Sequence, residues 1–567
     1  MALTKKWQLR EYNDDHLPYV DKMPNLLRKL ISHMEFDSTE AIENFLNPKL
    51  KHLGDPFVLP DMQRAVDRIL LAAERQETVL IFGDYDVDGV TSVCLLSKIL
   101  ASYGIDAKTF IPKRTSEGYG LSEAALRRCF DCGDLPTLLV TVDCGTASVD
   151  DINSLVNQGV DVVVIDHHEM TNLGRPKAHA IVNPKLGDTH HYLCAAGVVF
   201  KVGHALLKQK PVPCLDLKRL TDLVAVATIS DIVPLVDENR ILVRHGLKML
   251  PYTDNEGLKA LQEVTGLMDN DRVTSLDVGF RIGPRINAAG RMDCPEDALS
   301  TLECESCDLA KKMAAQLDVY NRERQLTEQT IHKNAIDLIE QNPEIKNKPV
   351  IVVADKNWHP GVVGIVASRL MREYHKPAFV ISIDNDGVGK ASGRSIPGVS
   401  LVEAIDACRD YLINGGGHEM AAGLTIKEEY IDQFRNYFSE FVTEKLGDEA
   451  IRPTINIAAD VTFDELTMNF LDSYALLQPF GNSNPQPIFM ACCVKLAKPI
   501  RFLKNGHAIF TFEQGFIQHE GIFFGLGERE LPPEPWDIAF HIDRNSFRGR
   551  NYLQLIVQDI RAAESEK

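Results

Sequence analysis

The stretch "TVLIFGDYDVDG", residues 78–89, joins a run of apolar residues to three aspartates at every second position and then a glycine. Residues 78–82 are all β-branched or apolar, which is typical of a buried strand in a parallel sheet. The aspartates also fit the opening of an EF-hand calcium loop. That interpretation fails, because the closing position is Leu95, which carries no carboxylate, and because a strand rather than an amphipathic helix precedes the loop. The stretch therefore predicts an α/β domain with carboxylates at a strand end.

Short apolar segments continue to alternate with helical ones downstream of this stretch. Strands are expected at "AKTFIP", "TLLVTV" and "VDVVVI", and helices at "VTSVCLLSKILASYG", "SEAALRRCF" and "VDDINSLVNQG". Short, fully apolar strands that are separated by helices indicate a parallel sheet covered on both faces, with right-handed crossovers. We therefore predict a doubly wound α/β domain.

The remaining chain divides into further domains. Residues 304–342 carry helical apolar spacing without Gly or Pro, which predicts one long helix that bridges two domains. A second, smaller α/β domain follows, and the strand-rich C-terminal part fits a small β-barrel. The predicted parts are an N-terminal segment 1–45, the first α/β domain 46–302, the bridging helix 303–342, the second α/β domain 343–446 and the barrel 451–563.

Composition limits the class of protein. The chain has 567 residues and no stretch near the roughly 18 apolar residues of a membrane helix, and its N-terminus lacks the apolar core of a signal peptide. We therefore expect a soluble cytoplasmic protein without membrane contact, whose twelve cysteines stay reduced. A net charge of −19 argues against binding to nucleic acid by general positive charge. The charge does not exclude a nucleic-acid enzyme whose basic residues are concentrated in a groove and whose acidic residues hold divalent metals.

Three strand ends carry acidic or imidazole groups. In an open parallel sheet, ligands bind beyond the carboxyl ends of the strands, so these groups should converge. Asp231 lies in an otherwise apolar helical stretch, where an unpaired charge would be costly to bury and a metal would explain it. An oxygen-rich site with one or two imidazoles suits two Mg²⁺ or Mn²⁺ ions. The strand-end residues are Asp84, Asp86 and Asp88, then Asp143, and then Asp166, His167 and His168.

Four motifs in this order, "GDYDVDG", "VDCGT", "IDHHE" and "ISDIVPL", resemble those of the DHH phosphoesterase superfamily. Further downstream, "GPRINAAGR", "WHPGVVGIVASRL", "KASGRS" and "GGGHEMAAG" resemble its RecJ branch, the single-strand-specific exonucleases. The resemblance covers nearly the whole chain from about residue 40. It implies that the C-terminal barrel has the OB-like fold that RecJ proteins carry.

The resemblance implies roles for the residues of the first four motifs. His168 is expected to contact the scissile phosphate or to stabilise its developing charge. Phe82 stands where some members of the superfamily carry a His, so this site has less imidazole and leaves open which aspartate binds which ion. The implied metal ligands are Asp84, Asp86, Asp88, Asp143, His167 and Asp231.

A second set of residues is expected to bind the substrate. Arginines suit phosphate because they bind it in bidentate geometry, and the glycine run is typical of a turn whose N–H groups approach a phosphate closely. Structural salt bridges are the competing role for each arginine. Cations and aromatics interleave in "RNSFRGRNY", as in single-strand grooves, although a solvated hairpin fits as well. The candidates are Arg285, Asn287, Arg291, Arg394, Ser395, Gly416, Gly417, His418, Arg548 and Arg550.

We therefore expect a metal-dependent exonuclease that hydrolyses single-stranded DNA from the 5′ end to 5′ mononucleotides, in recombination and repair. The resemblance alone implies the polarity, as it implies a monomer with single-strand binding protein and a helicase as candidate partners. The alternatives are a DHH phosphodiesterase of short oligonucleotides or cyclic dinucleotides, a pyrophosphatase, and a non-catalytic single-strand-binding scaffold. Length and the C-terminal barrel favour a polymer substrate, and the complete set of carboxylates argues against the scaffold.

Overall fold

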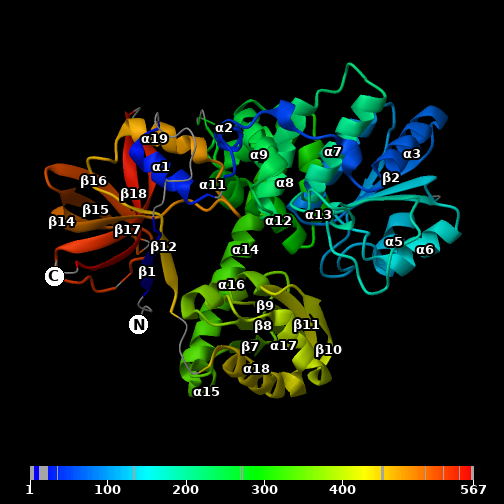
Figure 1. Cartoon of the computed structure of the whole chain (residues 1–567). Helices are drawn as coiled ribbons and strands as arrows, with labels where there is room; N and C mark the ends of the chain where they lie inside the picture. The colour runs from blue at the N-terminus through cyan, green and yellow to red at the C-terminus, as the bar shows by residue number, and fades with distance from the viewer. Residues whose placement is uncertain are drawn as a thin grey trace. The chain divides into compact units, whose positions relative to one another are not determined.

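The chain forms two compact units, one of Leu50–Ile451 and one that joins Met1–Lys49 to Arg452–Lys567. The computed structural model describes residues 5–11, 23–34, 36–131, 135–268, 270, 272–447, 452–504, 506–527, 529–547 and 550–563, but not the side chains of 546–550. The larger unit contains both α/β domains and the long helix between them (Figure 1). The smaller unit contains the barrel.

The first α/β domain is built on a five-stranded sheet that is parallel throughout, with the order β3-β2-β4-β5-β6. Alternate residues of β2 point to opposite faces. Val79 and Ile81 pack with helices α3, α4 and α7, whereas Leu80 and Phe82 pack with α5 and α6 (Figure 1). The predicted doubly wound sheet is thus confirmed. Its strands are β2 Val79–Gly83, β3 Lys108–Phe110, β4 Leu138–Val142, β5 Asp161–Ile165 and β6 Ala180–Val182.

Helices cover both faces of this sheet. Helices α3, α4 and α7 lie on one face and α5 and α6 on the other. Helix α4 begins within the acidic stretch, because the Asp86 side chain accepts a hydrogen bond from the N–H of Gly89 at 3.1 Å and caps the helix. The helices are α3 Met62–Arg75, α4 Val87–Ser102, α5 Glu123–Phe130, α6 Val149–Asn157 and α7 Ala195–Gln209.

A helical layer completes the first domain. Helix α8 ends at Ser230, so Asp231 caps its C-terminus and does not lie inside a longer helix as the apolar pattern predicts. The chain turns there because Ile232 adopts a left-handed conformation with φ of +58°. The elements are α8 Thr221–Ser230, α9 Asp237–Met249, α10 Glu256–Val264, α11 Ser275–Asp277, the π-helical turn η6 Val278–Ile282, α12 Gly283–Arg291 and α13 Pro295–Glu303.

The predicted bridging helix is α14, Cys307–Gln341. It packs against α10, α12 and α13 of the first domain and against α16 and β7 of the second. The second domain has a mixed sheet with the order β10-β11-β9-β8-β7. Its elements are β7 Ile351–Asp355, α16 Val363–Tyr374, β8 Ala378–Ile383, β9 Val388–Arg394, α17 Leu401–Ala407, β10 Leu412–Gly417, β11 Ala421–Lys427 and α18 Ile431–Leu446.

The smaller unit is a closed five-stranded barrel with an N-terminal addition. The strands follow the order β14-β15-β16-β18-β17, and pairing of β14 with β17 closes the barrel, as the predicted OB-like fold requires. Strand β1, Lys6–Leu9, pairs in parallel with β12, Thr454–Ile457. The other elements are α1 Asn25–Ser32, α2 Thr39–Leu46, β13 Ala459–Asp460, α19 Met468–Tyr474, β14 Phe489–Phe502, β15 Ala508–Gln514, β16 Ile517–Phe523, β17 Trp536–Phe547 and β18 Arg550–Ala562.

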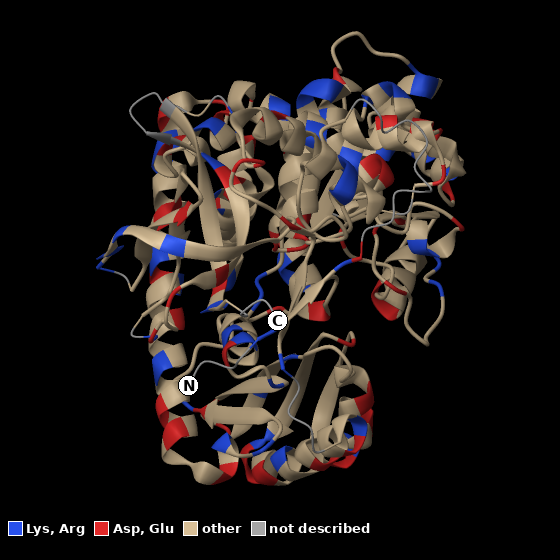
Figure 2. Cartoon of the chain, turned by 60° about the vertical axis from the view of Figure 1, so that its left-hand side comes forward, with Lys and Arg blue, Asp and Glu red and all other residues tan. Residues whose placement is uncertain are grey.

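Charged residues and cysteines are distributed along the described chain. Acidic and basic residues are mixed along the helices and loops of the chain (Figure 2). The cysteines that the structure describes are free thiols. Among the described helices, none combines the length and the apolar character that a bilayer crossing requires.

Candidate active site

The acidic and imidazole groups converge at the carboxyl edge of the first sheet. Asp84 follows β2, Asp143 follows β4, and His167 and His168 come two and three residues after β5. Asp231 reaches the same place from the C-terminal end of α8. This is the edge at which open parallel sheets bind their ligands.

The ligand atoms lie close enough to share metal ions. The Nε2 atom of His167 is 3.2 Å from an Asp143 oxygen and 3.7 Å from oxygens of both Asp88 and Asp231. Among the residues that the structure describes, three groups each have their ligand atoms within 4.8 Å of one another. They are Asp84 with Asp86 and Asp143, Asp88 with His167 and Asp231, and Asp143 with His167 and His168.

Several of these atoms lack the partners that buried polar groups need. Among the described residues, Asp84 Oδ1, Asp143 Oδ1 and His167 Nε2 are buried without a hydrogen bond. Burial and the neighbouring carboxylates raise the pKa of Asp84 and Asp143 well above the usual range and that of Asp231 to about 9. Burial lowers the pKa of His167 to about 4, which leaves its ring neutral. Unpaired carboxylate oxygens around a neutral imidazole fit divalent cations, whose charge would offset the repulsion.

His168 is held differently from His167. Its Nδ1 lies 2.8 Å from Asp166 Oδ1, and the Tyr119 hydroxyl, which donates to the Asp143 carbonyl at 2.9 Å, lies 3.2 Å from Nε2. Burial favours the neutral ring, but the hydrogen bond to Asp166 and the surrounding carboxylates raise the pKa of His168 to about 9. Asp166 also accepts the N–H groups of Thr146 and His167, so it fixes the whole strand end. The arrangement keeps a cationic imidazole beside the cluster.

Asp88 lies at the meeting point of two helices. It belongs to the first turn of α4, and its oxygens accept the N–H groups of Ala195 and Ala196 at 2.7 and 2.9 Å. These donors are at the N-terminus of α7, where the helix dipole favours a negative charge. Asp88 therefore ties α7 to the site while one oxygen still faces His167.

Arginines from two domains gather next to the cluster. Arg291, at the end of α12, donates to the carbonyl of Gly361 in the second domain at 2.9 Å, and Arg114 lies over the Tyr85 ring at 5.2 Å. Burial, with Arg114 and other cations nearby, lowers the pKa of Arg291 to about 10, and burial and Arg114 lower that of Arg394. Arg114 also lines a cavity of about 110 Å³ with residues of both domains, among them Ser392. Crowded cations of this kind suit a phosphate group.

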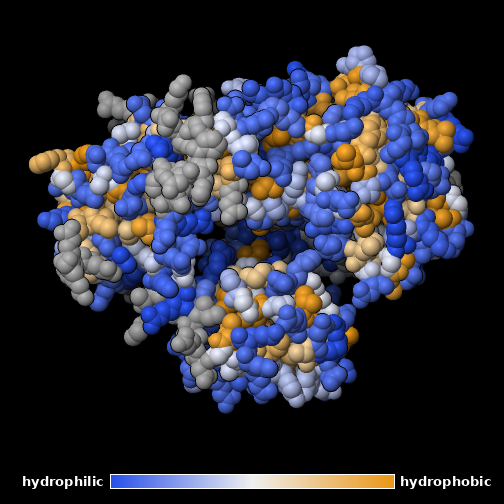
Figure 3. Space-filling model, in the orientation of Figure 1, coloured by the Kyte–Doolittle hydropathy of each residue, from blue (hydrophilic) through white to orange (hydrophobic). Residues whose placement is uncertain are grey.

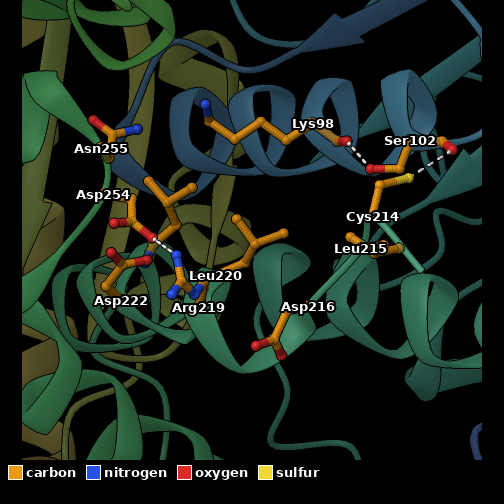
Figure 4. Close-up of a pocket in the computed structure, with 11 residues that line it drawn as sticks. Lys98, Ser102, Cys214, Leu215, Asp216, Arg219, Leu220, Asp222, Asp254 and Asn255 are labelled. Carbon is orange, nitrogen blue, oxygen red and sulfur yellow. Dashed lines mark hydrogen bonds and ion pairs between the residues drawn. The ribbon is translucent and has the colours of Figure 1, made fainter. Parts of the chain in front are cut away.

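A larger pocket lies away from these groups. It has a volume of about 240 Å³ and is formed at the C-terminal end of α4 and the N-terminal end of α8 (Figure 4). Asp222 and Lys98 line it, and an Arg219–Asp254 ion pair of 2.6 Å lies at its wall. Because the same two helices carry Asp88 and Asp231 at their other ends, this pocket is at the opposite side of the domain from the cluster.

Three family models match parts of the chain. The DHH family, N-terminal domain, matches residues 78–228, the DHHA1 domain matches 347–444 and the RecJ OB domain matches 457–559. The single-stranded-DNA-specific exonuclease RecJ of Bacillus subtilis is 34% identical over 575 residues, which is 100% of this chain and 72% of the relative. The same exonuclease of Escherichia coli is 31% identical, over 95% of this chain and 96% of its own length. This chain belongs to the RecJ family.

Solved structures agree with the assignment to the RecJ family. RecJ from Thermus thermophilus in complex with Mn²⁺ superimposes with a TM-score of 0.82 at 27% identity, over 99% of this chain and 80% of that chain. The same protein with Mg²⁺ gives a TM-score of 0.76, also at 27% identity, over 99% of this chain and 79% of that one. The predicted architecture of a DHH domain, a second α/β domain and a barrel is therefore confirmed.

The residues expected to bind substrate are spread over several places. Arg285 makes an ion pair of 2.8 Å with Asp318 of α14, which is the competing structural role. Ser395 is buried and donates its hydroxyl to the Val399 carbonyl at 2.7 Å. Asn287 is partly buried on α12. As RecJ substrate ligands these residues stay predictions.

The glycine run is a hairpin and not only a turn. Gly416 and Gly417 lie in strand β10, and His418 begins the connection to β11. A Cβ added to Gly416 would meet no described atom within 4 Å, so the backbone there is open to a ligand. Arg548 and the side chain of Arg550 lie outside the described residues.

Two residues next to the cluster, Tyr119 and Arg114, were not predicted as site residues, and a third, Asp166, was predicted to converge there without a role of its own. Tyr119 and Arg114 lie in the connection between β3 and α5, which has no periodic pattern that would mark them. Asp166 stands directly before the two histidines. Its hydrogen bond with His168 Nδ1 depends on how the backbone folds at the strand end. The sequence indicated Asp166 by its place at a strand end, but it did not indicate the hydrogen bond to His168.

Proposed function

We propose that this chain is a metal-dependent exonuclease that hydrolyses single-stranded DNA from the 5′ end and releases 5′ mononucleotides. The observation that carries the proposal is the cluster of buried carboxylates and imidazoles without partners, in a chain of the RecJ family. Its relatives are described as single-stranded-DNA-specific exonucleases. A role in DNA recombination and repair follows from that family.

Two divalent ions, Mn²⁺ or Mg²⁺, would fit the cluster. Asp143 and His167 each belong to two of the three ligand groups, so adjacent ions would share ligands. The ligands would be Asp84, Asp86, Asp88, Asp143, His167 and Asp231. Bound ions would polarise the scissile phosphate and lower the pKa of the attacking water.

His168 would act on the phosphate itself. Its raised pKa keeps the ring protonated near neutral pH, so it can donate to a phosphate oxygen as negative charge develops. Asp166 orients the ring through the hydrogen bond to Nδ1 and stabilises its charge. Asp166 is thus a positioning residue, and His168 is the residue that touches the substrate.

The arginines would hold the 5′ end. A terminal phosphate carries more charge than an internal one, and Arg291, Arg394 and Arg114 offer several donors beside the cluster. A strand anchored there by its 5′ phosphate would present its first internal phosphodiester to the carboxylates. Release of one nucleotide at a time from the 5′ end follows.

The test is digestion of a long single-stranded DNA labelled at either end, with Mn²⁺ or with EDTA. Wild type should release labelled mononucleotide at once from the 5′-labelled strand, and Asp143→Ala should release none. Asp254→Ala, an exposed carboxylate by the distant pocket, serves as the matched control and should behave as wild type.

The other outcomes decide between the alternatives. Survival of long DNA with cleavage of dinucleotides, cyclic dinucleotides or pyrophosphate would replace the proposal by a small-substrate phosphoesterase. Binding of DNA without any cleavage would indicate a scaffold. A monomeric state and the partners that the family implies, single-strand binding protein and a helicase, stay predictions.

A further inference from the structure

Asn239, in the first turn of helix α9, joins two segments of the chain that lead to the acidic cluster. Its Nδ2 donates one hydrogen bond to the Tyr192 carbonyl at 2.5 Å and another to the Pro234 carbonyl at 3.0 Å. Both acceptors are carbonyl oxygens, so the nitrogen of the amide must face them. One side chain thus uses both of its donors to hold two segments that are distant in the sequence.

The Tyr192 segment leads into helix α7. Tyr192 stands just before α7, whose first two N–H groups hold the Asp88 carboxylate at 2.7 and 2.9 Å. Glu238, beside Asn239, also binds α7, through an ion pair of 2.8 Å with the fully buried Lys201. The first turn of α9 therefore anchors α7 at two points, and α7 in turn holds Asp88.

The Pro234 segment follows Asp231. The chain reverses directly after Asp231, because Ile232 has a φ of +58°, which is a strained conformation for a β-branched residue. Strain of this kind persists only where the surrounding structure enforces it. The hydrogen bond from Asn239 to the Pro234 carbonyl fixes the segment just beyond the reversal. It thereby helps to keep the Asp231 carboxylate in place, 3.7 Å from the His167 Nε2.

Burial shows that Asn239 is not an ordinary surface residue. The visible surface is mostly hydrophilic (Figure 3), and asparagines are usually exposed, but Asn239 is 0% exposed. Burial of an amide costs free energy unless the amide is hydrogen-bonded. Among the described residues its Oδ1 has no hydrogen-bond partner, so the two donor bonds are what offset its burial. An apolar side chain would fill the same space at lower cost, but it would hold neither segment.

We infer that Asn239 is a positioning residue for one of the two metal ions, the ion that Asp88, His167 and Asp231 would bind. The inference rests on the proposed function, because it takes the cluster as a metal site. Asp88 is held by α7 and Asp231 by the segment after α8, and Asn239 fixes both. The first ligand group instead follows strands β2 and β4 and is placed by the sheet. Loss of Asn239 should therefore weaken the binding of one ion and spare the other.

The test is titration of the metal-free, full-length protein with Mn²⁺, in which electron paramagnetic resonance counts the bound ions. Wild type should bind two. Asn239→Ala should bind one ion as wild type does and the second about tenfold more weakly or worse, the loss typical when a group that orients metal ligands is removed. Asn239→Ser, which can donate to one carbonyl at most, should weaken the same ion and gives the answer if Asn239→Ala does not fold.

Asn484→Ala is the matched control. Asn484 is also a buried asparagine whose Nδ2 donates to two carbonyls, those of Leu477 and Pro479 at 2.9 and 2.7 Å, but it lies in the smaller unit. Its replacement should lower the melting temperature as Asn239→Ala does and still leave two ions bound. The inference is wrong if the Asn239 variants bind both ions as wild type does, or if they lose both ions equally.

A double variant identifies the ion that Asn239 serves. Asp231→Asn should already lack that ion, so the addition of Asn239→Ala should leave the affinity for the remaining ion unchanged. A further loss of about tenfold in this background would mean that Asn239 acts on the whole cluster, which overturns the inference. A wild type that binds no Mn²⁺ would instead overturn the metal site of the proposed function, so the two failures are distinguishable.

Discussion

Asp143 illustrates how the site is built at the scale of single residues. It has a φ of +60°, which residues other than glycine rarely adopt, and the strand before it is fully buried. The left-handed conformation turns the chain sharply at the strand end, and the carboxylate comes 3.2 Å from the His167 Nε2. Backbone strain and the burial of unpaired oxygens both oppose folding here. A bound cation would offset part of that cost.

Replacement of one proposed metal ligand should therefore lower the nuclease activity while it raises the stability of the metal-free protein. Asp231→Asn removes a carboxylate whose pKa burial and Asp88 raise to about 9, so we expect more than 100-fold loss of nuclease activity with a higher melting temperature for the metal-free protein. Asp222→Asn, at the other end of α8, should keep full activity. Nuclease rates and thermal unfolding in EDTA check both. Equal loss of activity in the two variants would contradict the assignment.

The same carboxylates predict a pH dependence. Raised pKa values of Asp143 and Asp231 mean that the metal-free fold binds protons more tightly than the unfolded chain does, so its stability falls as pH rises toward 9. Mn²⁺ must displace those protons, so its affinity should rise with pH, by about tenfold per unit for each proton released. Calorimetric titration at pH 6, 7 and 8 in two buffers measures affinity and proton release. An affinity that does not change over this range would count against a carboxylate site.

At the scale of elements, α4 depends on a glycine at its start. A Cβ on Gly89 would lie 2.3 Å from the Asp84 carbonyl oxygen, which is backbone and cannot move aside. Gly89→Ala should push α4 away from β2, lower the melting temperature and weaken Mn²⁺ binding by more than tenfold. Gly279→Ala is the control, since its nearest neighbour is 3.8 Å away. Similar melting temperatures and Mn²⁺ affinities for the two variants would show that the close approach is unimportant.

Elements with local patterns were predictable from sequence, and those set by distant pairing were not. The buried strands β2, β4 and β5 and the acidic groups after them followed from apolar runs and from the geometry of parallel sheets. The end of α8 did not, because the apolar pattern continues past Ser230 while the backbone reverses at Ile232. Arg114 and Tyr119 come from an aperiodic connection, so only the fold brings them to the site.

At the scale of the whole molecule, the first residues of the chain belong with the last. Strand β1 pairs with β12 across more than four hundred residues, which no local pattern indicates. Trp7 fastens this pairing, since its Nε1 donates to Asp559 at 3.0 Å and Arg561 lies over its ring at 4.5 Å. The unit of Met1–Lys49 with Arg452–Lys567 is therefore expected to depend on its N-terminal strand.

Trp7→Ala should destabilise this smaller unit by about 2 kcal/mol, through the loss of one hydrogen bond, the cation–π contact and apolar packing. Mn²⁺ affinity should not change, because the proposed metal ligands all lie in the larger unit. Urea unfolding followed by proteolysis and mass spectrometry locates the unit that opens first. If residues 50–451 of the variant opened first, Trp7 would not act on the stability of the smaller unit as a separate part of the chain.

The number of Mn²⁺ ions bound per chain tests the central claim most directly, because it needs neither substrate nor activity. Electron paramagnetic resonance of free Mn²⁺ during titration should give two bound ions for wild type and fewer than two for Asp143→Asn and Asp231→Asn. Asp222→Asn should bind two. If the two cluster variants bound Mn²⁺ as wild type does, the carboxylates and imidazoles at the carboxyl edge of the first sheet would not be the metal site.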